Sequence, residues 1–293
     1  MHKLTYWIGQ LSWPGPFKRL GQLQVSRWLD GLRTKPIPDA LWQATLQHYP
    51  FLAILPAADQ LRLRALARDF LHSKEFSGAA GLEITDSMAV AVAAQACLPL
   101  LYMGKKALKL YDDFKGIVLH PGAMLARRER TDAAGVVHHY REAIAGEAMD
   151  SGPVTLSWED AAASAHTASQ GHNLVIHEFV HKIDMRDGAA NGCPPLGSRL
   201  KRRIWQAVMA PAYQRFRQQV VLADRFGGEP AWLDSYGAQS PVEFFAVAAE
   251  AYFVNRERFE LDFPDVTKLF DGFFGALDKN ASSTNGIEDP HGN

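Results

Sequence analysis

The sequence predicts a helix-rich α+β fold in which a small mixed sheet packs against helices. Two observations lead to this prediction. Short apolar segments typical of strands alternate with helical segments through the middle of the chain, between residues 82 and 165. Apolar residues at helical spacing dominate before this part and again after residue 174. A few strands within a mainly helical chain are typical of one sheet layered on helices.

The first part of the chain, residues 1–80, is expected to form a helical N-terminal region. A helix opens within residues 37–42, where Asp39 is the expected N-cap because its carboxylate can accept the free backbone N–H groups of the first turn. A second helix begins at residue 57 and runs to about His72. These helices precede the segments that are predicted to form strands.

The next part, residues 81–277, contains the expected sheet. A strand is closed by a Pro-Gly pair after residue 120, and Ser157 is the expected N-cap of the helix that follows the last strand. An apolar helix ends before Pro99, because the residue before a proline avoids helical geometry. The expected strands are 82–85, 116–120 and 153–158; one expected helix, 86–96, lies between the first two strands, and another, to residue 165, follows the last.

Residues 177–181 form an H-E-x-x-H motif, His-Glu-Phe-Val-His. On a helix, residues four apart share a face, so the imidazoles of His177 and His181 can converge on one zinc ion while the carboxylate of Glu178 handles the proton of a water. The helix is expected to end at Gly188, as a left-handed C-cap. The alternative is a core helix whose histidines are satisfied by hydrogen bonds, but packing gives no reason for a glutamate between them.

Hydrolytic zinc sites use three protein ligands and keep the fourth position for water, so a third ligand is needed. Glu243 is the best candidate, because it lies at the start of a helix that is apolar apart from Glu243 and Glu250. A buried carboxylate must be paired or metal-bound. The alternative is a capping box, in which Ser240 is the N-cap and Glu243 only reaches back to its amide.

Four motifs give the chain a family resemblance: residues 76–82, 94–99 and 177–184, and the seven-residue spacing from Tyr236 to Glu243. Together they resemble the Mlc titration factor A family of bacterial zinc peptidases, from about residue 37 to 274. The catalytic end is also similar to the anthrax lethal factor protease domain, where a Tyr likewise precedes a ligand Glu by seven residues. The resemblance implies a zincin-like catalytic domain, aminopeptidase activity and association with a sugar-regulated transcriptional repressor.

The resemblance also implies a role for each matching residue. Glu178 would be the general base that deprotonates the water and then protonates the leaving amine. Tyr236 would donate its phenolic hydrogen to the developing oxyanion; the alternative is a packing or surface tyrosine. One Zn²⁺ per chain would be bound by His177, His181 and Glu243.

Asp184 and Glu250 are candidates to orient the ligand imidazoles through their free N–H groups. Both could equally be helix-end or salt-bridge carboxylates. Zincins usually bind an extended substrate along an edge strand, and either residues 116–120 or residues 154–158 are expected to form that edge.

Composition limits the classes of function. The chain has 293 residues and is 47% hydrophobic, enough for a large core, and its net charge of −1 gives no electrostatic case for direct nucleic-acid binding. The basic run at residues 199–203 begins an amphipathic helix and is expected to be a solvated face. Two cysteines give no disulfide framework, which fits the cytoplasm.

Neither a targeting segment nor a membrane span is expected. The longest apolar run, residues 88–103, contains Gln95 and Pro99 and is shorter than the roughly 20 residues that a bilayer requires. Residues 278–293 are polar without apolar periodicity, so we expect a disordered tail.

Two functions remain in competition. The first is a zinc peptidase that acts on peptide substrates and also binds a repressor. The second is a regulatory protein that sequesters a transcription factor, with the zinc site secondary. A structural zinc site would be closed by a fourth protein ligand, which the sequence does not show beside the histidine pair, and the intact Glu178 also favours catalysis.

Overall fold

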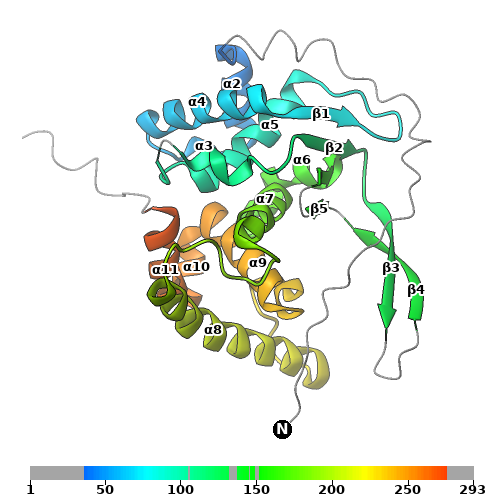
Figure 1. The fold of residues 1–293 in the computed structure, drawn as a ribbon, viewed down its shortest axis with the longest axis vertical. Helices are drawn as coiled ribbons and strands as arrows, with labels where there is room; N and C mark the ends of the chain where they lie inside the picture. Colours follow the sequence, from blue (N-terminus) through cyan, green and yellow to red (C-terminus); the bar gives the residue numbers. More distant parts are fainter. Residues whose placement is uncertain (1–35, 105, 132–136, 145, 149–151, 276–293) are drawn as a thin grey trace, which may run out of the picture.

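The computed structural model of the protein describes residues 36–104, 106–131, 137–144, 146–148 and 152–275 (Figure 1). Helices predominate, and a four-stranded mixed sheet lies among them, so the expected helix-rich α+β class is confirmed. The tail expected to be disordered, residues 278–293, lies outside the described residues.

Three helices begin the described part of the chain, and the helix expected from residue 57 to about 72 is confirmed. The N-cap of the first helix is Pro38, so the expectation of Asp39 is wrong by one residue. The Asp39 carboxylate instead pairs with Arg64 on the third helix, at 2.6 Å from Oδ1 to Nη1. The three helices are α2 (Asp39–His48), α3 (Pro50–Ala53) and α4 (Ala57–Ser73).

The four-stranded sheet has the order β1-β2-β6-β5. The first three strands run parallel, and the fourth pairs antiparallel with β6. Both segments expected to form the edge, 116–120 and 154–158, are therefore interior strands, and that prediction is wrong; among the described strands, the edges are β1 and β5. The strands are β1 (Glu75–Gly78), β2 (Gly116–His120), β5 (Gly146–Ala148) and β6 (Val154–Ser157).

The strand expected at residues 82–85 is wrong, because the first strand comes earlier, directly after α4. The chain turns sharply at residues 80 and 81, whose φ values are 52° and 81°. A Cβ atom on Gly78 would overlap the carbonyl oxygen of Leu82, so the returning chain lies where a side chain of β1 would be, and residues 82–85 form no strand. Residues 1–80 were expected to form a helical N-terminal region, but β1 lies within this range and belongs to the sheet.

A two-stranded antiparallel sheet, β3 (Met124–Thr131) and β4 (Val137–Ile144), follows β2 and extends away from the body of the molecule (Figure 1). No strand was expected in either of its two segments. Its segments hold many charged residues and lack the alternation of apolar and polar residues that marks a half-buried strand.

The apolar helix α5 (Asp86–Cys97) ends before Pro99 as expected, and α7 (Leu174–Asp184) runs through the centre of the molecule (Figure 1). The expected left-handed C-cap at Gly188 is wrong: a 3₁₀ turn follows α7, and Gly188 has a φ of 136° and a ψ of −149°. Five apolar side chains of α7 are fully buried: Val175, Ile176, Phe179, Val180 and Ile183.

The remaining helices of the described chain pack against α7 or around the helix at residues 241–254. Ser157 caps the first of them as expected, with its Oγ accepting from Asp160 N at 3.3 Å. The basic residues 199–203 at the start of the longest helix are exposed, as expected for a solvated face. None of the described helices is long and apolar enough to cross a bilayer. These helices are α6 (Trp158–Thr167), α8 (Arg199–Phe226), α9 (Pro241–Val254), α10 (Arg256–Asp262) and α11 (Pro264–Phe274).

Candidate metal centre

The two histidines of the motif lie one turn apart on α7. Asn173 is the N-cap of this helix, with its side-chain oxygen accepting from Ile176 N at 2.9 Å. The imidazoles of His177 and His181 share one face, and their Nε2 atoms are 3.0 Å apart. Two N–H groups at that distance would repel each other, so this face of α7 presents at least one nitrogen lone pair.

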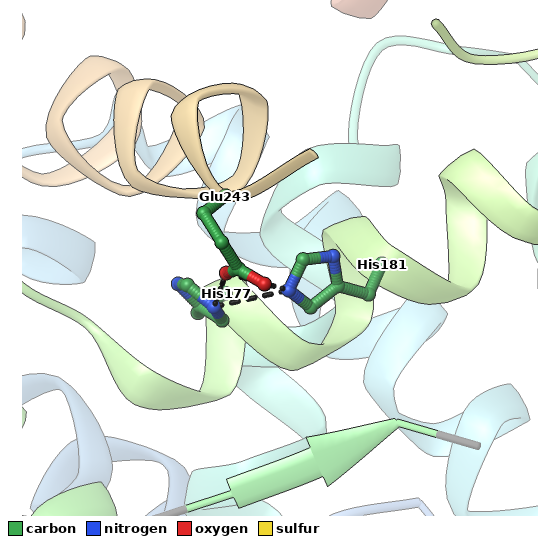
Figure 2. Close-up of side chains that lie close together, drawn as sticks. All are labelled: His177, His181 and Glu243. Atoms are coloured by element: carbon green, nitrogen blue, oxygen red, sulfur yellow. Dashed lines mark hydrogen bonds and ion pairs between the residues drawn. The ribbon is translucent and has the colours of Figure 1, made fainter. Parts of the chain in front are cut away.

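Glu243 reaches the same point from the first turn of α9 (Figure 2). Ser240 caps α9, and its Oγ accepts from Glu243 N at 3.2 Å. The Glu243 side chain does not reach back to complete a capping box. Its Oε2 atom lies 3.2 Å from His177 Nε2 and 3.3 Å from His181 Nε2.

These three ligand atoms fit a zinc ion. They form a triangle with edges of 3.0, 3.2 and 3.3 Å. A tetrahedral Zn²⁺ with ligands at about 2.0–2.1 Å separates any two of its ligand atoms by about 3.3 Å. Nitrogen and carboxylate oxygen are also the donor types that zinc uses in hydrolytic sites. Three ligands from two helices leave a fourth tetrahedral position for a water.

The electrostatics of the site favour a cation. Burial by itself lowers the pKa of His177, but Glu250 and Glu243 outweigh it and hold that pKa well above its ordinary value. Burial raises the pKa of Glu243, but hydrogen bonds from both imidazoles outweigh this and lower that pKa strongly. The space between these side chains therefore stabilises positive charge, whether a proton or a metal ion carries it.

Glu178 lies beside the triangle and is only 5% exposed. Strand β5 passes directly over it: a Cβ atom added to Gly146 would lie 2.5 Å from Glu178 Oε1 and 2.7 Å from its Cγ. Burial raises the pKa of Glu178, against the opposite influence of His177 and His181. Within the described part of the chain, no group donates a hydrogen bond to this carboxylate. It is therefore available to exchange protons with a bound molecule.

Glu250 accepts a hydrogen bond from the far side of the His177 imidazole. Its Oε1 atom lies 2.6 Å from His177 Nδ1, and its Oε2 atom accepts from Asn173 N at 2.5 Å. A hydrogen on Nδ1 leaves the lone pair of the imidazole on Nε2, which faces the triangle. Of the two carboxylates considered for orienting an imidazole, Glu250 has the required contact.

Asp184 lies elsewhere. Its carboxylate accepts backbone N–H groups from residues 191, 192 and 193, at 2.7 to 3.0 Å, and so ties the loop after α7 to the end of that helix. Its position about one helical turn after His181 suggested a contact with that imidazole. Its oxygens instead accept these three backbone hydrogen bonds. This is the helix-end role that the sequence analysis kept as its alternative.

Tyr236 lies at the rim of the site, on the 3₁₀ turn Ser235–Ala238. Its ring centroid is 6.0 Å from that of His177, and the residue is 41% exposed. Asp234 holds the turn by accepting from Tyr236 N at 2.9 Å, and its other oxygen lies 3.2 Å from His172 Nδ1. This ion pair raises the pKa of His172 and lowers that of Asp234.

Sequence reasoning missed Asp234 and His172 beside Tyr236, and Asn173 beneath Glu250. The only signal for Asn173 was its position before an apolar helical run, which is typical of an N-cap. Asp234 lies two residues before Tyr236, at a spacing typical of an Asx turn.

The chain matches a metallopeptidase family model and is similar to several known proteins. Residues 23–275 match the family model described as glucose-regulated metallo-peptidase M90. The chain is 35% identical over 232 residues to the uncharacterised protein slr2042 of Synechocystis, covering 77% of this chain and 81% of that protein. It is 34% identical over 236 residues to proteins named Mlc titration factor A from Yersinia pestis and Yersinia pseudotuberculosis, covering 80% of this chain and 84% of each relative.

Proposed function

Because this chain belongs to the glucose-regulated metallo-peptidase M90 family, we propose that it is a zinc-dependent peptidase that holds one Zn²⁺ per chain. The observation that carries the proposal is the triangle of His177, His181 and Glu243 ligand atoms, with edges of 3.0 to 3.3 Å. The buried Glu178 beside it supports catalysis over a structural metal. Among the described residues, this group has no fourth His, Cys, Asp or Glu to close it.

The residues around the triangle have distinct roles in the proposed reaction. A bound zinc ion supplies an acidified water and polarises a carbonyl oxygen. Glu178 takes the proton from the attacking water and transfers it to the amine that leaves. Tyr236 donates a hydrogen bond from its hydroxyl to the oxyanion that develops on the scissile carbonyl. Both side chains that act in the proposed reaction therefore lie close to His177. Glu178 follows it directly on α7, and the ring of Tyr236 lies near its imidazole.

We further propose a zincin-like arrangement, in which the substrate lies along β5. Among the described strands, β5 pairs with β6 alone, and its backbone passes directly over Glu178. An extended peptide can add to a free strand edge through main-chain hydrogen bonds. A peptide so bound would have its carbonyl carbon near the carboxylate that activates the water.

Metal analysis combined with a substrate panel tests the proposed function. We expect about one zinc per chain, and turnover that disappears with a chelator and returns with Zn²⁺. Aminoacyl p-nitroanilides and internally quenched peptides, assayed side by side, separate the proposed aminopeptidase action from endopeptidase action. A chain that contains zinc but cleaves neither class would support the regulatory alternative.

The names of the Yersinia relatives support a second function. Those proteins are named for the titration of Mlc, and we propose that this chain likewise binds a transcriptional repressor protein. Peptide hydrolysis and repressor binding are compatible, because each can use a different surface.

A Tyr236→Phe variant should keep its fold and its zinc while kcat falls by roughly 10²-fold, with a smaller change in KM. The substitution removes one hydroxyl and leaves the ring that packs near His177. Stopped assays with saturating peptide measure kcat, and metal analysis of the same preparation is the control. Turnover within about twofold of the wild type would show that Tyr236 only packs against the site.

A Gly146→Ala variant should lower kcat by about 10²-fold, because a misplacement of about 1 Å can have that effect. The new methyl group would press against the Glu178 carboxylate, which has little room to move because it is buried. Gly272→Ala is the matched control, since no atom lies within 4 Å of a Cβ at that position. If the two variants have equal kcat and zinc content, β5 does not confine Glu178.

A further inference from the structure

Gln95 lies on α5, a helix that supplies none of the three ligand atoms. It belongs to the segment 94–99 that carries part of the family resemblance, yet the proposed reaction gives it no role. The side chain is fully buried, at 0% exposure. Its Nε2 donates to Ala91 O at 3.2 Å, and its Oε1 accepts from Asn173 Nδ2 at 2.8 Å. Both ends of this amide are therefore satisfied inside the protein.

Backbone groups fix the direction of this chain of hydrogen bonds. The carbonyl of Ala91 can only accept, so it must face the Gln95 NH₂ group. The N–H of Ile176 can only donate, so it must face the Asn173 side-chain oxygen. The Gln95 oxygen and the Asn173 NH₂ group then meet as acceptor and donor. Turning over either amide would place two donors or two acceptors against each other.

From Asn173 the chain continues to the metal centre. The backbone N–H of Asn173 donates to Glu250 Oε2 at 2.5 Å. The other oxygen of Glu250 accepts from His177 Nδ1 at 2.6 Å. The hydrogen on Nδ1 leaves the Nε2 lone pair to face the ligand triangle, so a series of hydrogen bonds that begins at the backbone of α5 sets both the tautomer and the direction of a ligand.

We propose that Gln95 is a positioning residue of the metal centre, which acts on the imidazole of His177 through Asn173. The Gln95 oxygen holds the Asn173 side chain in its capping conformation. That conformation places the Asn173 backbone N–H on the Glu250 carboxylate, which orients the imidazole. All four residues are buried, with at most 9% exposure, so water cannot replace a lost partner without rearrangement. The inference rests on the proposed zinc site.

Zinc affinity tests this role directly. Gln95→Met keeps an unbranched side chain of similar length but leaves the Asn173 NH₂ group without an acceptor. We expect the Zn²⁺ dissociation constant, measured by competition with a chromophoric chelator, to rise by about tenfold, the low end for groups that orient a metal ligand. The visible absorption of the Co²⁺-substituted protein should also shift, because it reports the ligand geometry.

Thr267→Val is the matched control. Thr267 is also buried and bonds back to its own helix, with Oγ1 donating to Phe263 O at 3.0 Å, but it lies on α11 and takes no part in the chain of hydrogen bonds. A merely structural role for Gln95 would make both variants melt at a lower temperature with unchanged zinc affinity. That result would overturn the proposal.

An Asn173→Asp variant provides a second test if Gln95→Met does not fold. Aspartate keeps the N-cap oxygen for Ile176 but replaces the donor to Gln95 by an oxygen, so zinc affinity should again fall by about tenfold. Where Gln95→Met does fold, the double variant Gln95→Met/Asn173→Asp no longer sets two oxygens against each other, so its zinc affinity should be no lower than that of Asn173→Asp alone. Additive losses would contradict a shared path. Wild-type protein that binds no zinc would instead refute the proposed function itself.

Discussion

A Glu178→Gln variant should keep its fold and its zinc but lose kcat for peptide hydrolysis by about 10³- to 10⁴-fold. Glutamine has the size and shape of glutamate, so the close packing against Gly146 is preserved, but its amide cannot take a proton from water. The carboxylate is not one of the three grouped ligands, so metal content should be unchanged. Saturation kinetics and metal analysis on one preparation measure both quantities.

Glu229→Gln is a suitable control, because Glu229 is exposed and lies outside the site. A repressor pull-down with the Glu178→Gln protein separates the two proposed functions. Partner binding should persist, since recognition is proposed to use a surface away from the site. Loss of binding together with hydrolysis would mean that the partner occupies the active site, whereas retained hydrolysis would exclude Glu178 as the base.

The parts of the site that the sequence could predict are those determined by short-range geometry. The spacing of His177 and His181 places their imidazoles on one face of any helix, and α7 is a helix. The Ser-Pro pair at 240 and 241 marks the start of α9, so Glu243 was expected in its first turn. The sequence did not decide whether the Glu243 carboxylate would turn back to the amide of Ser240 or point toward the two histidines. Packing of α9 against α7 decides that question.

The remaining features depend on long-range packing. The position of β5 at the edge of the sheet follows from the order of the strands. The strand has only three residues, Gly146–Ala148, which are too few to show a periodicity in the sequence. Residues 82–85 have the composition of a strand, but a turn at residues 80 and 81 brings Leu82 back over Gly78, and the segment joins no sheet. Gln95 and Asn173 are 78 positions apart in the chain, so no local pattern could pair them. Asp184 lies about one helical turn after His181, but its carboxylate oxygens accept hydrogen bonds from the backbone of the loop at residues 191–193.

The ligand assignment predicts a graded loss of zinc. Structural sites with four protein ligands bind Zn²⁺ with a free energy of about 10–16 kcal/mol, so each ligand contributes about 3 kcal/mol on average. His181→Ala and Glu243→Ala should therefore raise the zinc dissociation constant by more than about 10²-fold, and activity should disappear with the metal. Glu250→Ala removes only the group that orients His177, so its loss should be closer to tenfold.

Competition with a chelator measures all three variants on one scale, and zinc content after gel filtration gives an independent check. Unchanged zinc in His181→Ala would refute the assignment of the site. Losses that are equal in the two variants, or larger for Glu250→Ala, would contradict the assignment of Glu243 as the third ligand. The geometry favours the graded result, because Glu243 Oε2 lies 3.2 and 3.3 Å from the two Nε2 atoms, whereas Glu250 contacts Nδ1 on the opposite edge of the ring. A carboxylate on that edge can influence the metal only through the imidazole.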